Sequence, residues 1–291
     1  MVITKSRDYK FIDCGENSRL EQFGDFLVER PASQAFWPKN RECAKWDMKK
    51  AYFKRTDSKG GKWLGSGLPE SFTIGIGTVE LLLKLKPTSF GHLGFFPEHL
   101  PQADIMKKIA VDKDRKNMNM LNLFGYTGAI SLASAITGWQ VTHLDASRST
   151  VQWAKENAKL NHIESIRWIT DDSLKFVKRE IRRKKRYEAV IMDPPSFGRG
   201  SQGQVFKLEK DLPGLVENCI SLLSGDACLF AVTSHTPGVT GSALANLLIP
   251  LAVKRGGLIE AGENLLAATE SQNVLPCGHY ARWVSGGKPA G

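Results

Sequence analysis

From about residue 118 onward, short apolar runs alternate with longer segments whose apolar residues recur at helical spacing. This alternation is typical of repeated βαβ units, which build a mainly parallel sheet with helices on its faces. It predicts an α/β fold with a Rossmann-like sheet of seven strands. The expected strands are residues 118–124, 140–144, 165–170, 189–192, 228–233, 257–262 and 280–284. The expected helices are residues 129–137, 150–161, 174–183, 208–223 and 242–254.

The N-terminal part of the chain has a different pattern of residue types. Its glycines and prolines are scattered, residues 71–79 form a short alternating segment, and residues 37–55 are basic and aromatic. Such a pattern favours short strands and loops. We therefore expect two domains, a β-rich region over residues 1–87 and a Rossmann-like domain over residues 88–291.

The charge and the cysteines narrow the functional classes. The chain has 40 Lys and Arg against 30 Asp and Glu, a net charge of +10, which favours a polyanionic partner such as nucleic acid, although excess charge can also serve solubility alone. Its five cysteines contain no C-x-x-C pair, so they predict neither a zinc site nor a disulfide framework, and they favour a reducing cytoplasm. No apolar run is long enough to predict a membrane span or a secretory signal.

A glycine-containing turn follows the first expected strand. Residues 122–128 read NLFGYTG and run directly into an Ala- and Ser-rich helix. Glycines there let the backbone and the helix amides approach a ligand, although they can equally form a plain tight turn. The glycine that meets a pyrophosphate in the G-x-G-x-x-G fingerprint is missing, which disfavours a nicotinamide cofactor.

Acidic residues follow the next two expected strands. Asp145 lies about 20 residues beyond Gly125, where an α/β sheet places a carboxylate that accepts from ribose hydroxyls. The alternative is that Asp145 caps the next helix, for which Ser147 is the better candidate. Asp171 and Asp172 follow the third strand, where Asp172 can accept from an adenine amino group or cap a helix.

The fourth expected strand is followed by Asp193, Pro194 and Pro195, and then by Ser196, Phe197 and Gly198. Two successive prolines hold the backbone extended and rigid, with carbonyls available to a planar amino or imino edge. Because ligands of α/β sheets bind beyond the carboxyl ends of the strands, we expect this segment to be functional rather than a simple loop.

The sequences NLFGYTG, HLDAS, ITDDS and MDPPSFGRG, in this order, resemble the class I S-adenosylmethionine-dependent methyltransferases, and more narrowly the bacterial branch that includes the large-subunit ribosomal RNA methyltransferases. The upstream segment FGHLGFFPE and the segment RPASQAFWPKNR are similar to a subgroup of that branch. The resemblance implies S-adenosylmethionine as cofactor. The residues it implies at the cofactor are Phe96, Pro97, Asn122, Phe124, Gly125, Tyr126, Thr127, Gly128, Asp145, Ala146, Ser147, Asp172, Ser173 and Asp193. The implied catalytic residues are Asp193, Pro194, Pro195, Phe197 and His235, and no metal is implied.

The residues around the expected site limit the methyl acceptor. Methylation of cytosine carbon-5 needs a cysteine thiolate, and neither the Pro-Pro segment nor residues 233–236 contain one. Cys228 comes about five residues too early along its strand and is expected in the core. A ring nitrogen or exocyclic amine of a ribosomal RNA base is therefore favoured. The alternatives are a protein or small-molecule acceptor and a non-catalytic, cofactor-binding RNA assembly factor.

Three segments are candidates for contact with RNA. Residues 178–186 read KREIRRKKR, which binds phosphates or is simply a solvated helix face. The N-terminal stretch interleaves Lys49, Lys50 and Lys54 with aromatic residues. A glycine-rich loop over residues 198–203 precedes Lys207 and Lys210, and it either closes over the substrate or is an ordinary flexible loop. The oligomeric state is left open.

Overall fold

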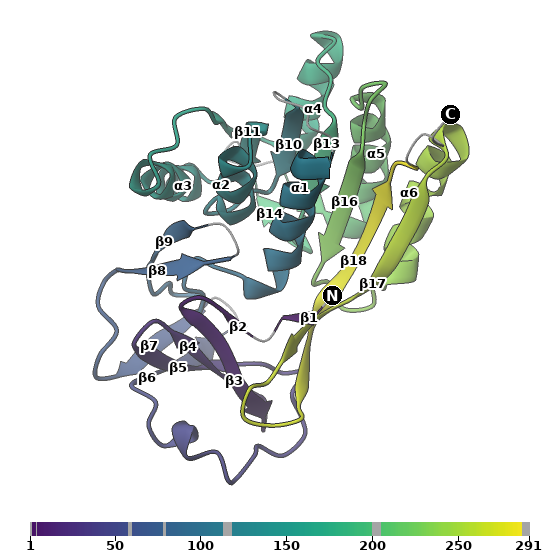
Figure 1. Ribbon diagram of the computed structural model, residues 1–291. Coiled ribbons are helices and arrows are strands. Elements are labelled where there is room, and N and C mark those ends of the chain that lie inside the picture. The colour runs from purple at the N-terminus through teal and green to yellow at the C-terminus, as the bar shows by residue number, and fades with distance from the viewer. Residues whose placement is uncertain are drawn as a thin grey trace. The chain divides into compact units, whose positions relative to one another are not determined.

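The computed structural model describes residues 2–3, 5–57, 60–77, 80–112, 118–199 and 205–286 (Figure 1). The chain forms two compact units. The first unit comprises Met1–Asp104 and Asn264–Cys277, and the second comprises Ile105–Glu263 and Gly278–Gly291. The units do not coincide with the boundary expected between residues 87 and 88, which stays a prediction about independently folding domains.

The second unit is built around a mainly parallel sheet. Strands β10 (Asn119–Leu123), β11 (Gln140–Asp145), β12 (Arg167–Thr170), β13 (Ala189–Met192) and β16 (Leu229–Ser234) pair in parallel in the order β12-β11-β10-β13-β16. Strand β18 (Val274–Val284) pairs antiparallel with β16 and is followed in the sheet by β17 (Leu258–Ala267). All seven predicted strands are present, and the α/β, mainly parallel fold is confirmed.

The last two strands are longer than their apolar patterns suggested. Strand β17 extends past residue 262 and β18 begins before residue 280, so that Asn264–Cys277 belongs to the first unit. There Leu265 and Leu266 pair in parallel with β1 (Val2–Ile3), which adds an eighth strand to the sheet. Polar residues such as Glu263, Asn264, Glu270 and Gln272 interrupt the apolar residues between 262 and 280, so the apolar pattern did not extend the two strands through this segment.

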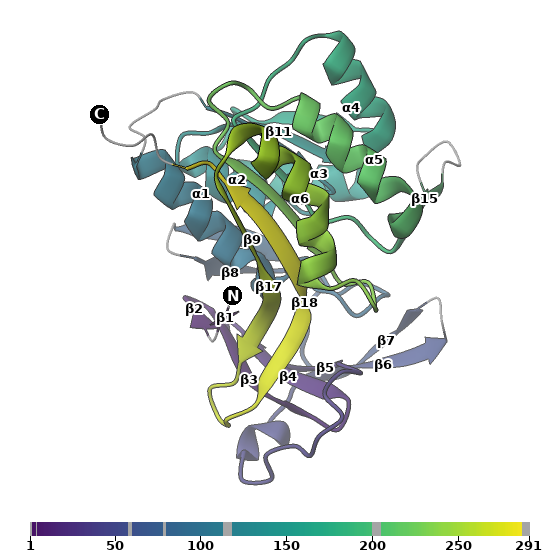
Figure 2. The ribbon, with the colours of Figure 1, turned by 90° about the vertical axis from the view of Figure 1, so that its right-hand side faces the viewer.

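The described residues include six α-helices, and five of them lie where the periodicity placed them. These five are α2 (Ala129–Ile136), α3 (Arg148–Leu160), α4 (Ser173–Arg182), α5 (Leu208–Ser221) and α6 (Gly241–Arg255). Helix α5 contacts both α4 and α6, and Figure 2 shows these three helices side by side, whereas α2 contacts α3. Helix α1 (Leu100–Asp112) was not predicted. No helix among the described residues is long and apolar enough to cross a bilayer.

The apolar core of the second unit explains why the strand pattern was readable. Its central strands are buried on both faces, as the continuous apolar runs predict. Strands β10, β13 and β16 pack their apolar side chains against α5 and α6. The buried side chains of this core include Leu121, Leu123, Val190, Met192, Phe230, Val232, Leu212, Leu215, Leu244 and Leu248.

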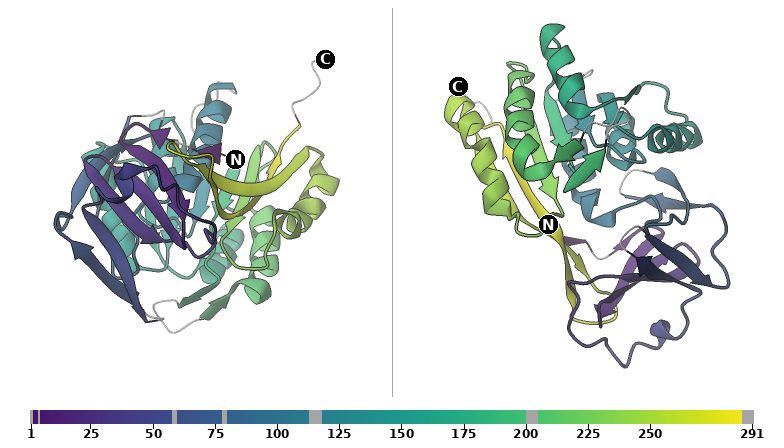
Figure 3. Two further views of the ribbon diagram at one scale, coloured as in Figure 1. Left: turned by 90° about the horizontal axis from the view of Figure 1, so that it is seen from below. Right: turned by 180° about the vertical axis from the view of Figure 1, so that it is seen from behind.

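The first unit is β-rich, as expected. Its main sheet, seen at the left of Figure 3, has the order β2-β3-β4-β5-β6-β7, and β8 pairs with β9 in a separate hairpin. Two short 3-10 helices, η1 (Ala44–Trp46) and η2 (Pro97–His99), complete it. The strands are β2 (Lys5–Ser6), β3 (Tyr9–Gly15), β4 (Ser18–Phe23), β5 (Phe26–Pro31), β6 (Ala51–Asp57), β7 (Gly60–Gly65), β8 (Phe72–Ile76) and β9 (Leu81–Leu85).

The first unit, like the second, buries charged side chains. Arg30 donates two hydrogen bonds to the carboxylate of Glu21, from Nε at 2.7 Å and Nη2 at 2.8 Å, and the Tyr9 hydroxyl donates a third at 3.0 Å. Asp13 accepts from the indole of Trp46 at 2.8 Å and from Ser271 at 2.6 Å. These bonds compensate the buried carboxylates, and the Asp13 bonds tie the segment Asn264–Cys277 to strand β3.

Candidate active site

The strand order of the second unit reverses at β10. Strands β11 and β12 extend the sheet on one side of β10, and β13 and β16 extend it on the other. In open α/β sheets, ligands bind at such a switch point, beyond the carboxyl ends of the strands. The predicted site residues between Asn122 and His235 all follow carboxyl ends of these strands, so the topology brings their segments to one edge of the sheet.

The turn after β10 has an uncommon backbone. Phe124, Tyr126 and Gly128 all have positive φ, at 58°, 51° and 91°. Left-handed conformations of aromatic residues are energetically unfavourable, and they cluster at functional sites. Within the turn, the Gly125 amide donates to the Leu144 carbonyl at 2.9 Å and the Gly128 amide to the Gly125 carbonyl at 3.0 Å. Sequence reasoning identified the two glycines but could not have found the strained aromatics.

Gly125 is required because a buried histidine lies against it. A Cβ at position 125 would lie 2.5 Å from ring atoms of His143. The Nδ1 atom of His143 is 2.9 Å from the Ser131 hydroxyl, which also accepts from the Asn122 amide at 2.9 Å. Burial lowers the pKa of His143 to about 3, so the ring is neutral. Asn122 is therefore part of a buried network beneath the turn, and direct contact with the cofactor stays a prediction.

Asp145 is the last residue of strand β11, and its side chain accepts a hydrogen bond from a backbone amide of the turn. Its Oδ2 accepts from the Tyr126 amide at 3.0 Å, and its Oδ1 accepts from the Ser147 amide at 2.9 Å. Burial raises the pKa of Asp145, while these amides oppose the rise. The cap of α3 is Ser147, whose hydroxyl accepts from the Thr150 amide at 3.3 Å, so the assignment of the cap to Ser147 is confirmed. Each carboxylate oxygen of Asp145 retains a second lone pair for a ligand hydroxyl.

Asp172 follows strand β12 as a helix cap. Its Oδ1 accepts from the Lys175 amide at 2.9 Å, which fixes the start of α4 at Ser173. Asp171 pairs instead with Arg179 at 2.5 Å. The capping interpretation of Asp172 is thus confirmed, and its role at an adenine stays a prediction because its second oxygen is still able to accept.

The Asp-Pro-Pro segment follows β13 at the centre of the sheet. Asp193 Oδ1 accepts from the Thr233 hydroxyl at 2.5 Å and lies 3.9 Å from Nε2 of His235. Thr233 and His235 belong to the end of β16 and the loop after it. Pro194 is buried and Pro195 is exposed, while the Ser196 hydroxyl lies 2.7 Å from that of Thr236. The structure therefore brings together Asp193 and His235, as the candidate proton acceptors require.

A hairpin that the sequence did not reveal continues from this segment. Strand β14 (Phe197–Arg199) pairs antiparallel with β15 (Val205–Lys207), and Phe197 lies opposite Lys207. The ring of Phe206 packs on Phe124, with centroids 5.3 Å apart, whereas Phe197 is 52% exposed. The expected glycine-rich loop is therefore partly a hairpin. Residues 200–204 of that loop lie outside the described residues.

Phe96 and Pro97 belong to the first unit. Phe96 precedes η2, and its ring contacts His92 and His99, with centroids 5.0 Å and 6.2 Å apart. Pro97 is buried at the first position of η2. Their proposed place over the cofactor stays a prediction.

Part of the N-terminal basic stretch forms ion pairs or is buried within the first unit. Lys49 pairs with Glu29 at 3.0 Å, Lys45 pairs with Glu270 at 2.5 Å, and Trp46 is buried. Lys50 and Lys54 are exposed. For Lys50 and Lys54, and for the exposed Arg41 and Arg55 of the same stretch, contact with RNA stays a prediction.

Comparison with known proteins identifies a family for most of this architecture. The family model "S-adenosylmethionine-dependent methyltransferase" matches residues 94–245. A crystal structure of the SAM-dependent methyltransferase from Agrobacterium tumefaciens superimposes with a TM-score of 0.92 and is 33% identical, covering 98% of this chain and 93% of that one. A structure of SMU.776 in complex with SAH has the same fold, with a TM-score of 0.71 and 18% identity, covering 96% of this chain and 76% of that one.

Curated relatives match a shorter stretch. The ribosomal RNA large subunit methyltransferase K/L of Shewanella frigidimarina is 34% identical over 145 residues, which are 48% of this chain and 19% of that protein. The ribosomal RNA large subunit methyltransferase K of Neisseria meningitidis is 29% identical over 114 residues, 38% of this chain and 32% of that protein. The chain thus spans less than a third of the length of these relatives.

Proposed function

Because this chain belongs to the S-adenosylmethionine-dependent methyltransferases, we propose that it methylates a ring nitrogen or exocyclic amine of a base in ribosomal RNA. The observation that carries the choice of acceptor is the state of the cysteines. All five are buried, and burial raises the pKa of Cys14, Cys43, Cys219 and Cys277. Cys228 directly precedes β16 and so lies at the amino end of that strand. A thiolate for attack on a cytosine ring is therefore missing, whereas a nitrogen needs no covalent intermediate.

The residues at the switch point fit the cofactor. When bound, S-adenosylmethionine supplies a methyl group on a cationic sulfur. The turn over Phe124–Gly128 offers backbone at close range, since Gly125 has no Cβ and Gly128 adopts a positive φ. Asp145 offers acceptors for ribose hydroxyls, and Asp172 for an adenine amine. The carboxylates at this edge, including Asp193, also favour a cationic ligand.

In the methyl transfer, the residues of this chain position the acceptor nitrogen and take up the proton that it loses. Methyl transfer needs the nucleophile held in line with the methyl carbon, which is mainly a matter of orientation. The rigid Pro194–Pro195 backbone presents a carbonyl to an amine edge, and Asp193 accepts a hydrogen bond from that edge. The proton that the nitrogen loses passes to Asp193 or to the neighbouring His235.

The β14–β15 hairpin supplies a surface for the substrate. Phe206 anchors the hairpin on Phe124, while Phe197 and the exposed Lys207 lie directly opposite each other. An exposed aromatic ring stacks on a base, and a lysine beside it attracts the adjoining phosphate. We infer that the ring of Phe197 stacks on the target base.

Ribosomal RNA is the favoured substrate for two reasons. The curated relatives are named ribosomal RNA large subunit methyltransferases, and the net charge of +10 favours a polyanion. Action on ribosomal RNA places the protein in the cytoplasm.

The test is to incubate the full chain with methyl-labelled S-adenosylmethionine and RNA from cells that lack its gene. Digestion and mass spectrometry then identify the labelled nucleoside. We expect one nucleoside labelled at nitrogen, and loss of most label with Phe197→Ala at unchanged cofactor affinity. Label at carbon-5 of cytosine would contradict the acceptor, and label in protein alone would contradict the RNA substrate.

A further inference from the structure

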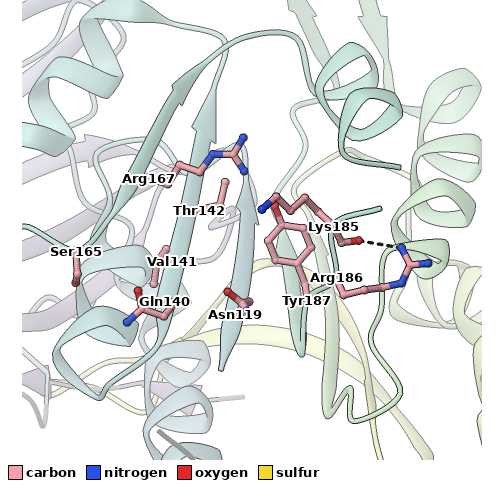
Figure 4. Close-up of a pocket in the computed structure, with 9 residues that line it drawn as sticks. All are labelled: Asn119, Gln140, Val141, Thr142, Ser165, Arg167, Lys185, Arg186 and Tyr187. Carbon is pink, nitrogen blue, oxygen red and sulfur yellow. Dashed lines mark hydrogen bonds between the residues drawn. The ribbon is translucent and has the colours of Figure 1, made fainter. Parts of the chain in front are cut away.

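A second pocket lies within the second unit, at the amino ends of the parallel strands. It has a volume of about 180 Å³ (Figure 4). Its walls include the first residues of three strands, Asn119 of β10, Gln140 of β11 and Arg167 of β12. Strand β10 is five residues long, so this pocket is about 16 Å from the turn at the other end of the sheet. It is therefore separate from the site at the carboxyl ends.

Two of the residues that line the pocket, Arg167 and Tyr187, bind the buried carboxylate of Glu180. Arg167 donates to both oxygens of Glu180, at 2.7 Å and 3.0 Å, and the Tyr187 hydroxyl donates to the same carboxylate at 2.6 Å. Burial raises the pKa of Glu180, but the bonds from Arg167 and Tyr187 outweigh it and lower the pKa overall. Glu180 therefore offsets part of the positive charge of Arg167 and of Arg183, which pairs with it at 3.4 Å.

The rim, in contrast, carries positive charge that this ion pair does not neutralise. Lys185 and Arg186 are exposed, and among the described residues neither forms an ion pair. Figure 4 shows Lys185 reaching toward Arg167 and Tyr187, while Arg186 turns to the opposite side and donates to the Lys185 carbonyl at 2.9 Å. The hydroxyl of Ser165 and the amide side chain of Gln140 add uncharged polar groups. The exposed Arg182 and Lys184 continue this basic rim at the end of α4, whereas Arg183 between them pairs with Glu180.

We propose that this pocket and its basic rim bind a phosphate group, supplied by the backbone of the RNA substrate. The volume is below the ~300–1,000 Å³ of typical small-molecule sites, so the pocket holds a phosphate rather than a whole nucleotide. Lysine and arginine side chains with hydroxyl and amide donors are the groups that bind phosphate. The rim over residues 182–186 then carries adjoining phosphates of the same strand. The source of the phosphate rests on the proposed function, whereas the phosphate site itself does not.

A phosphate site here is a second contact with the RNA, remote from the methylated base. Phosphate contacts fix register and orientation and are independent of base identity. The target base is then selected at the carboxyl end, and the strand is held at the amino end. A substrate long enough to reach both ends binds more tightly than a short one.

The test compares the double variant Lys185→Gln/Arg186→Gln with the matched control Lys108→Gln/Lys254→Gln. The control also removes two exposed lysine charges from the second unit, on α1 and α6. Binding of a fluorescent single-stranded RNA of about 12 nucleotides to the full chain is measured as a function of potassium chloride. Thermal melting of both variants checks that each is folded. Arg167 is left intact because its loss would remove two hydrogen bonds from the buried carboxylate of Glu180.

We expect the slope of log affinity against log salt to fall by about 1.4 in the Lys185→Gln/Arg186→Gln variant, which is two lost contacts at ~0.7 each. The control keeps a slope near that of the wild type. Equal slopes in the two variants would overturn the proposal. Adenosine monophosphate and inorganic phosphate are titrated as well. Loss of their binding in the first variant, with RNA binding unchanged, would overturn the RNA backbone as the source and leave a site for the phosphate group of a free ligand. Binding is read without methyl transfer, so failure of the proposed methylation is a separate result.

Discussion

The two ends of one parallel sheet carry opposite chemistry. At the carboxyl ends, Asp145, Asp172 and Asp193 follow three strands. At the amino ends, Arg167 begins a strand and Lys185 and Arg186 precede another. The same five parallel strands therefore separate an acidic edge from a basic edge by the length of a strand, about 13–16 Å.

This separation has a physical basis in the helices. In βαβ units, each helix begins near the carboxyl end of one strand and ends near the amino end of the next. Helix N-termini favour carboxylates and C-termini favour cations. Asp172 at the start of α4 and the basic residues at its end fit this rule. The acidic edge suits a cofactor with a cationic sulfur, and the basic edge suits a phosphate. The predictions below test the acidic edge, in order of decreasing effect.

The largest effect is expected from Gly125→Ala. The new Cβ would lie 2.5 Å from the His143 ring, in a fully buried network that cannot shift freely. Overpacking of this kind costs about 3 kcal/mol, and cofactor binding should fall with it. Chemical denaturation measures the loss. Gly214→Ala in α5 is the control, since nothing lies within 4 Å of its Cβ, and it should stabilise by about 0.5–1 kcal/mol. Equal effects of the two substitutions would contradict the close approach.

The second prediction concerns pH. The pKa of His143 is about 3 in the fold, below the ~6.5 of an unfolded chain. Its contribution to stability is therefore present above pH 6.5 and is lost as the pH falls toward 3. Between pH 7 and pH 5 the loss is about 2 kcal/mol. Denaturation of wild type and His143→Gln at both pH values isolates this amount. If both proteins lose the same stability, the histidine is not buried in its neutral form.

The third prediction addresses the cofactor directly. Asp145→Ala removes the proposed acceptor for ribose hydroxyls, and the affinity for S-adenosylhomocysteine should fall about tenfold, or ~1.4 kcal/mol. Isothermal titration measures it. The control Glu164→Ala removes one exposed carboxylate from the loop before β12 and should leave the affinity unchanged. An unchanged dissociation constant for Asp145→Ala would contradict the assignment of Asp145 as the acceptor for ribose hydroxyls.

The smallest effect is expected from Asp172→Ala, which removes the cap of α4 and should cost about 1 kcal/mol of stability. Asp172→Asn keeps the cap and should restore that stability. The Asn variant also separates the two interpretations of this residue. Weaker cofactor binding by Asp172→Asn at normal stability would support contact with adenine, and normal binding would leave Asp172 as a cap alone.

The sequence predicted the second unit well because its signals are local. Strands buried on both faces are continuous apolar runs, so β13 was predicted at its observed bounds, and the candidate site residues were read from the segments that follow such runs. The order of the segments NLFGYTG, HLDAS and MDPPSFG was enough to indicate the cofactor. The strain at Phe124 and Tyr126 was not predictable, because only the packing of the turn on His143 and Asp145 imposes it.

The first unit was less predictable because its determinants are distant in sequence. Its sheet buries Glu21 and Arg30, which as isolated residues are typical of a surface. Asp13 bonds to Ser271 and Asn273, more than 250 residues away, which no local pattern reveals. The amino-end pocket was missed for the same reason. Residues 178–186 showed a charge run, but only the fold places its end beside Gln140 and Ser165.

The most direct test of the account is amide hydrogen exchange with and without saturating S-adenosylhomocysteine. We predict slower exchange in residues 122–128 and 145–147, at the carboxyl ends of β10 and β11, and no change in residues 185–187 at the amino end. Protection confined to the amino-end residues, or none at the turn, would contradict the placement of the cofactor site at the acidic edge of the sheet.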